Sequence, residues 1–186
     1  MKKETIYASV TKNQKTAISI IRVSGPRVKK LAKILFKKKL VKGYINLRNI
    51  YSNSGEFIDQ GIVLLFLKPN SPTGEDVLEL QVHGSSSIIK KIEEELDEIK
   101  GVRQAEPGEF TKRAFYNNKL DLLQVEGLED LLESSTDLQR KQAQLLLMGS
   151  VSSKLNSWRY DLIELSSFIE TTICLLYTSP SPRDDR

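Results

Sequence analysis

The hydrophobic pattern of the chain changes once, near residue 120, and this change restricts the folds open to it. Before it, short runs alternate apolar with polar residues or are rich in β-branched residues, as strands are, and two segments have helical spacing. After it, apolar residues recur every three or four positions almost to the end. The sequence therefore predicts an α+β fold: a mixed β-sheet domain with helices packed on it, followed by long α-helices of an incomplete helical domain.

The stretch that joins the two parts is AEPGEFTKRAFYNNKLDL, at 105–122. Pro107 and Gly108 predict a turn, and Glu109 suits the first turn of a short helix, where a carboxylate meets unpaired N–H groups. Asn117-Asn118 should end that helix. Lys119 is therefore expected at a junction between two architectures, where clefts tend to form.

In the first part, the pattern predicts the element order ββαβββαβ. The strands are expected at 5–11, 17–24, 44–51, 57–67 and 77–83 and from residue 101, and the helices after Gly25-Pro26 and at 88–99. The first of these helices should bury Val28, Leu31, Ala32 and Leu35. The run FIDQGIVLLFL at 57–67 is typical of a central strand that is covered on both faces.

In the second part, Thr136 and Gln139 predict a capping box that opens one long helix. Apolar residues follow along it at near-heptad spacing, from Leu147 to Ile173, and missing helices or a second chain should cover them. We predict a first domain over 1–117 and a helical domain over 118–173. The tail at 174–186 ends in Ser-Pro-Ser-Pro, through which no helix continues, and we interpret it as a read-through or sequencing artefact on a truncated gene.

Two predicted strands carry polar side chains that suggest a binding site. Arg22 shares a strand face with Ile18 and Ile20, so it needs a carboxylate or an anionic ligand, unless the strand is at an edge of the sheet. On the strand at 77–83, alternation puts Glu79, Gln81 and His83 on one face. This stripe suits a heteroaromatic ligand, and it equally suits the solvent side of an antiparallel sheet.

Charge and motifs narrow the function classes. From Thr5 to Gly55 there are twelve Lys and Arg and no Asp or Glu, which gives either a polyanion-attracting surface or a solvated helix face. The single cysteine, Cys174, excludes an internal disulfide. No apolar run approaches ~20 residues and no signal peptide is visible, so we expect a cytoplasmic protein without membrane contact. There is no G-x-x-x-x-G-K-[ST] motif and no zinc-ligand spacing, so we expect no metal site and no GTP hydrolysis.

Three motifs carry a resemblance to a known family. IIRVSGP at 20–26, NSPTGEDVLELQVHG at 70–84 and PGEFTKRAFYNNKLDL at 107–122 resemble, in this order, the N-terminal part of the MnmE (TrmE) tRNA-modification GTPases. The resemblance implies that this domain binds a reduced folate, 5-formyl- or 5,10-methylene-tetrahydrofolate, with Arg22, Glu79 and Lys119 at the matching positions. His83 and Arg113 are second-tier candidates.

The chemistry of these residues suits such a ligand. A pterin ring presents adjacent N–H and NH₂ donors, which a carboxylate such as Glu79 can accept as a pair. Arg22 and Lys119 can pair with the carboxylates of the folate tail, and the sequence leaves open which cation meets which oxygen. We predict that these three side chains converge in one cleft.

The resemblance implies more about the whole enzyme. It would form a homodimer and act with the FAD-containing protein MnmG on tRNA, adding an aminomethyl-type group at C5 of the wobble uridine. GTP, Mg²⁺ and K⁺ would belong to a GTPase domain that this chain lacks, so we expect folate binding and dimerisation without turnover. Cys174 does not match the family's C-terminal cysteine motif. Two alternatives stay open: a stand-alone folate-dependent aminomethyltransferase-like domain, and a basic module that binds RNA through residues 12–48.

Overall fold

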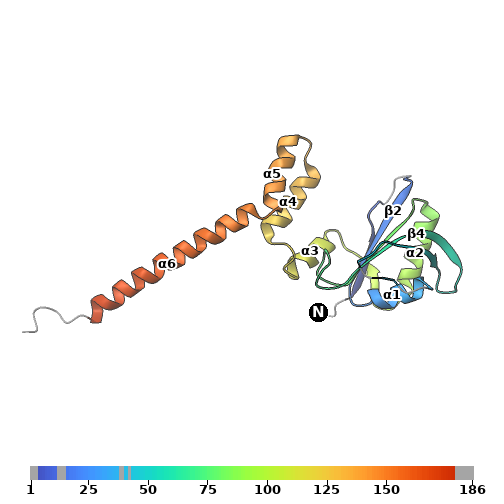
Figure 1. Ribbon diagram of the computed structural model, residues 1–186, viewed down its shortest axis with the longest axis horizontal. Helices are drawn as coiled ribbons and strands as arrows, with labels where there is room; N and C mark the ends of the chain where they lie inside the picture. The colour runs from blue at the N-terminus through green and yellow to red at the C-terminus, as the bar shows by residue number, and fades with distance from the viewer. Residues whose placement is uncertain (1–3, 12–15, 38–39, 42, 179–186) are drawn as a thin grey trace, which may run out of the picture. The chain divides into compact units, whose positions relative to one another are not determined.

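The computed structural model describes residues 4–11, 16–37, 40–41 and 43–178. The chain forms two compact units, Met1–Leu120 and Asp121–Arg186 (Figure 1). The division falls where the hydrophobic period changes, three residues beyond the predicted boundary after Asn117.

The first unit is built on one six-stranded sheet with the strand order β3-β4-β5-β2-β1-β6. Neighbouring strands are antiparallel, except that β1 and β6 are parallel. This mixed sheet and its element order confirm the predicted α+β class. The elements are β1 (Thr5–Ser9), β2 (Ile18–Ser24), α1 (Val28–Leu35), β3 (Asn46–Tyr51), β4 (Phe57–Phe66), β5 (Val77–His83), α2 (Ser86–Asp97), β6 (Val102–Gln104) and α3 (Glu109–Tyr116).

The hydrophobic core lies between one face of this sheet and the helices α1 and α2. Alternation along the strands sends every second side chain to this face, and most of those from β2, β4 and β5 are buried. The predicted stripe of α1 is buried against them, together with Ile92 and Leu96 of α2. The core side chains of the three strands are Ile21, Val23, Val63, Leu78, Leu80 and Val82.

The opposite face of the sheet is partly open. Ile18 of β2 and Leu47 of β3 are 59% and 60% exposed, and Ile20, Ile62 and Leu64 are half-buried. The prediction that β4 is covered on both faces is therefore wrong, because α1 and α2 both pack on the core face. An apolar run does not show by itself how many faces of a strand are covered.

The second unit is helical: α4 (Leu122–Glu133), α5 (Asp137–Leu147) and α6 (Ser150–Thr178). α4 and α5 each begin with a capping box, at Asp121 with Gln124 and at Thr136 with Gln139, the second as predicted. The two helices approach closely at Gly127, where an added Cβ would lie 2.7 Å from the Cβ of Leu146.

The prediction of one continuous helix from Thr136 to Ile173 is wrong. Gly149 has a φ of 75°, its N–H donates to the Leu146 carbonyl, and the helix axis is interrupted there. α6 then continues past Ile173 to Thr178, so the predicted tail begins inside a helix. The Ser-Pro-Ser-Pro sequence lies outside the described residues.

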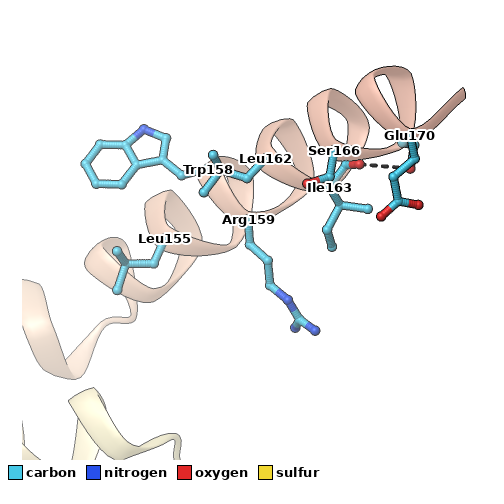
Figure 2. Close-up of a pocket in the computed structure, with 8 residues that line it drawn as sticks. Leu155, Trp158, Arg159, Leu162, Ile163, Ser166 and Glu170 are labelled. Atoms are coloured by element: carbon cyan, nitrogen blue, oxygen red, sulfur yellow. Dashed lines mark hydrogen bonds between the residues drawn. The ribbon is translucent and has the colours of Figure 1, made fainter. Parts of the chain in front are cut away.

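α6 carries the predicted apolar stripe on its surface. Leu155, Trp158, Leu162 and Ile163 contribute to a shallow hollow that is lined by this helix alone (Figure 2). Among the described residues, no helix is long and apolar enough to cross a membrane.

Candidate functional site

Arg22 and Glu79 form a direct ion pair on the open face of the sheet. The two residues are opposite each other in the antiparallel register of β2 and β5, so their side chains leave the sheet on the same side. Arg22 Nε donates to Glu79 Oε1 at 2.7 Å. The side chains are 35% and 12% exposed. Since β2 lies between β5 and β1, Arg22 is not on an edge strand.

The surroundings of this pair are mostly apolar. Leu64 of β4 is opposite Glu79 in the sheet, and the Arg22 guanidinium lies 6.0 Å from the centre of the Phe110 ring, a cation–π contact. Glu79 Oε2 and the two terminal nitrogens of Arg22 make no hydrogen bond within the described part of the chain. A ligand on this face could therefore donate a hydrogen bond to Glu79 Oε2 and accept hydrogen bonds from the terminal nitrogens of Arg22.

Lys119 follows α3, beyond Asn118, whose φ of 54° turns the chain. Its backbone N–H donates to the Ala114 carbonyl at 2.8 Å, and its side chain is exposed. The ammonium group has no ion pair or hydrogen bond among the described residues. The structure thus joins Arg22 and Glu79 directly, and it places Lys119 on a separate segment without a direct contact to either.

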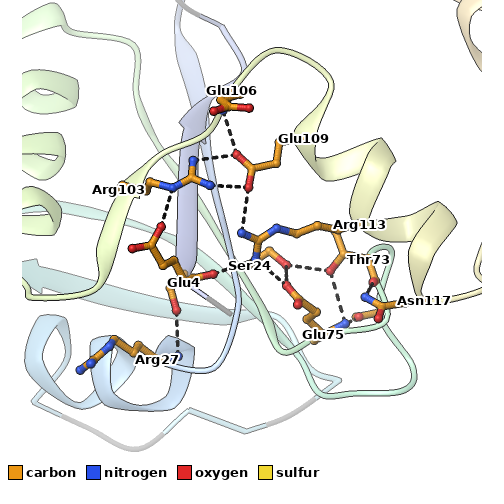
Figure 3. A network of polar contacts seen from close by, with 12 residues as sticks. Glu4, Ser24, Arg27, Thr73, Glu75, Arg103, Glu106, Glu109, Arg113 and Asn117 are labelled. Carbon is orange, nitrogen blue, oxygen red and sulfur yellow. Dashed lines mark hydrogen bonds and ion pairs between the residues drawn. The ribbon is translucent and has the colours of Figure 1, made fainter. Parts of the chain in front are cut away.

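A network of charged residues fastens α3 to the sheet domain (Figure 3). Arg113 donates to Glu75 and Glu109, both at 2.9 Å, and to the Glu4 carbonyl at 2.8 Å. Arg103 holds Glu109 with two hydrogen bonds, at 2.7 and 2.8 Å, and also pairs with Glu4. Arg113, a second-tier ligand candidate from sequence, is thus occupied by contacts within the protein. Helical spacing could not show this, because Glu4 and Glu75 lie far away in the chain.

This network changes the acidity of Glu109. Burial acts to raise its pKa, but hydrogen bonds from Arg103, the Glu106 N–H and Arg113 outweigh burial and lower it to about 2. The folded state therefore binds a proton on this carboxylate less readily than the unfolded state does.

We expect an acid-sensitive contribution to stability from Glu109. Its pKa falls from an ordinary 4.5 to about 2 on folding, so its contribution is complete above pH 4.5 and is lost as the pH falls towards 2. The shift corresponds to on the order of 3 kcal/mol at neutral pH. Urea unfolding of the wild type and of Glu109→Gln should show a stability gap that narrows by about 2 kcal/mol between pH 7 and pH 3. A gap of constant size would contradict this assignment.

His83, the other second-tier candidate, is oriented by a buried carboxylate. Its Nδ1 lies 2.8 Å from Asp59 Oδ1, and its backbone N–H donates to Asp59 Oδ2. Burial acts to raise the pKa of Asp59, but the hydrogen bonds from His83 and from the Gln60 N–H lower it. The imidazole itself is 71% exposed. Sequence reasoning missed Asp59, since alternation alone places it on the core face.

Phe110 is a further neighbour of the candidate site that the sequence did not reveal. Its spacing in α3 marks it as part of an apolar side, which is the usual signal of a core residue. No local pattern indicates that its ring meets a guanidinium on β2.

Comparisons with known proteins agree with these motifs. The family model described as "GTP-binding protein TrmE N-terminus" matches residues 5–119, which include Arg22, Glu79 and Lys119. The chain is 42% identical over 170 residues to the tRNA modification GTPase MnmE of a Ruegeria strain and 44% identical over 171 residues to that of a Wolbachia strain. It is 42% identical over 179 residues to the mitochondrial tRNA modification GTPase gtpbp3 of Dictyostelium discoideum. These matches cover 91–92% of this chain but only 35–40% of the relatives.

Proposed function

Because the chain belongs to the family of the TrmE N-terminus, we propose that it is the folate-binding, dimer-forming part of a tRNA modification GTPase. The observation that carries this proposal is the Arg22–Glu79 pair, which lies on interior strands of an open sheet face and keeps hydrogen-bonding groups free. A salt bridge with a purely structural role would more commonly have both partners satisfied within the fold.

The residues at this pair fit the chemistry of a reduced folate. Arg22 Nε fixes one oxygen of Glu79, which turns the other towards a ligand that presents N–H donors. The half-buried Leu64 and the Phe110 ring offer apolar contact to a flat ring system. Lys119 supplies a cation for a carboxylate of the ligand tail. The bound 5-formyl- or 5,10-methylene-tetrahydrofolate would supply a one-carbon unit, and the protein's own part is to bind and orient it.

We further propose that two copies of the first unit associate. Ile18 and Leu47 expose most of their apolar surface on the open face, beside the half-buried Ile20 and Ile62. Exposed apolar residues that share one face favour a protein–protein contact. Burial of these four side chains against a second copy would remove their apolar surface from water.

The activity of the whole enzyme is part of the same proposal. The relatives are named tRNA modification GTPases, and the chain spans about 40% of the length of the bacterial ones. In our proposal, the folate bound here serves a C5 aminomethyl-type modification of the wobble uridine in tRNA. GTP, Mg²⁺ and K⁺ act in the part of the relatives that this chain does not span, and MnmG is the partner protein.

Calorimetric titration of the 186-residue chain with 5-formyl-tetrahydrofolate tests this function. We expect saturable binding at one site per chain, a higher melting temperature with ligand, and the mass of two chains in light scattering. A monomeric chain that does not bind the folate would contradict the proposal. Tight, salt-sensitive RNA binding by the same chain without folate binding would instead favour the basic RNA-binding module.

A further inference from the structure

The geometry points to two further residues that act on the candidate site without touching the Arg22–Glu79 pair. We propose that Thr73 and Asn117 are positioning residues, which fix Lys119 relative to that pair so that one ligand can meet all three side chains. This inference rests on the proposed folate-binding function. It gives the loop at 72–75 and the end of α3 a role in ligand binding, although neither contacts the Arg22–Glu79 pair.

The first link runs from the strand of Arg22 to the loop. Ser24 lies two residues beyond Arg22 on the same face of β2 and is fully buried. Its Oγ is 2.7 Å from Thr73 Oγ1, which is also buried (Figure 3). The loop leads directly into β5, the strand of Glu79. Thr73 is therefore bonded to the strand of Arg22 and lies just before the strand of Glu79 in the chain.

The second link runs from the loop to the segment of Lys119. Asn117 Nδ2 donates to the Thr73 carbonyl at 2.7 Å. Gly74, at a φ of 73°, lies so close that an added Cβ would be 2.8 Å from Asn117 Cβ and 3.4 Å from Lys119 Cγ. The loop backbone is thus packed directly on Asn117 and on the stem of Lys119, and a side chain at position 74 would separate them.

Lys119 needs such support, because its own side chain is exposed and has no partner among the described residues. A lysine stem is long and loses much rotational freedom when it pairs with a ligand. Fixing its backbone and the first part of its stem reduces the conformations that binding must exclude. Asn117 should therefore affect ligand affinity only by positioning the Lys119 ammonium.

A double-mutant cycle with 5-formyl-tetrahydrofolate separates this role from general stability. In the 186-residue chain, we expect Asn117→Ala to weaken binding by roughly fivefold to tenfold, as a lost supporting hydrogen bond does. In a Lys119→Ala background, the same change should weaken binding by less than about twofold, because the group that it positions is already absent. Thr73→Val, which keeps the shape but removes the hydroxyl contact, should show the same dependence on Lys119.

Asn53→Ala is the matched control. This asparagine also donates a side-chain hydrogen bond, to Glu98 at 2.8 Å, in the turn between β3 and β4. Its loss should change stability and leave folate affinity unchanged. The inference would be overturned if Asn117→Ala lowered folate affinity equally with and without Lys119, or lowered it in neither background. If Asn117→Ala does not fold, the same comparison with Thr73→Val tests the inference. Failure of the wild-type chain to bind folate would overturn the proposed function itself, and this inference with it.

Discussion

Replacing Glu79 with alanine is expected to weaken binding of 5-formyl-tetrahydrofolate by at least about 100-fold, since it removes charge-assisted hydrogen bonds to the ligand. Arg22 also loses the partner that orients it. The fold should persist, because Glu79 lies on the open face and Arg22, 35% exposed, can be hydrated. We expect the variant to lose no more than about 1 kcal/mol of stability. Calorimetric titration and thermal unfolding measure the two effects.

Two further variants test whether the loss of affinity is due to the carboxylate of Glu79. Glu79→Gln keeps the shape of the side chain but offers only one acceptor oxygen, so it should lose most of the affinity too. Gln81→Ala changes the next position on the same face of β5 and should alter affinity by less than about threefold, because no charge is removed. Unchanged affinity in both Glu79 variants would remove Glu79 from the site.

Replacing Arg113 with methionine is expected to destabilise the first unit by about 2 to 4 kcal/mol, since it leaves carboxylates of low exposure without a counter-charge. Arg113 pairs with Glu75 and Glu109, whose side chains are only 10% and 11% exposed. Methionine keeps the apolar stem, so the loss of stability measures the effect of removing the charge and not of removing packing contacts. Urea unfolding of the variant beside the wild type gives the change directly.

Lys112→Met is the control for this prediction. Lys112 precedes Arg113 in α3, is exposed, and makes no ion pair within the described residues. Its replacement should change stability by less than about 0.5 kcal/mol. If Arg113→Met were equally mild, α3 would be held on the sheet by its apolar contacts, and the charged network would be secondary.

The element order of the first unit could be predicted from the sequence because its signals are local. Alternation marked β5, the spacing of Val28, Leu31 and Leu35 marked α1, and Pro107-Gly108 marked the start of α3. Each of these depends on residues within a few positions of one another. The capping box at Thr136 belongs to the same class of signal.

The features that the sequence did not reveal depend on distant partners or on small energy differences. Arg22 on an apolar face predicted either a carboxylate or an anionic ligand, and only the register of β2 with β5, 57 residues apart, identifies Glu79 as that carboxylate. Arg113 was a second-tier ligand candidate, and its ion pair with Glu75 was not predicted because Glu75 is 38 residues away. The break at Gly149 was missed because a single glycine in a helical pattern is often tolerated.

The most direct test of the account is a crystal structure of the 186-residue chain with 5-formyl-tetrahydrofolate. We predict that the pteridine lies on the open sheet face, with its N–H donors about 2.7 to 2.9 Å from Glu79, and that Arg22 and Lys119 both reach the same ligand molecule. A folate bound away from β2 and β5, with the Arg22–Glu79 pair facing only solvent, would contradict the account.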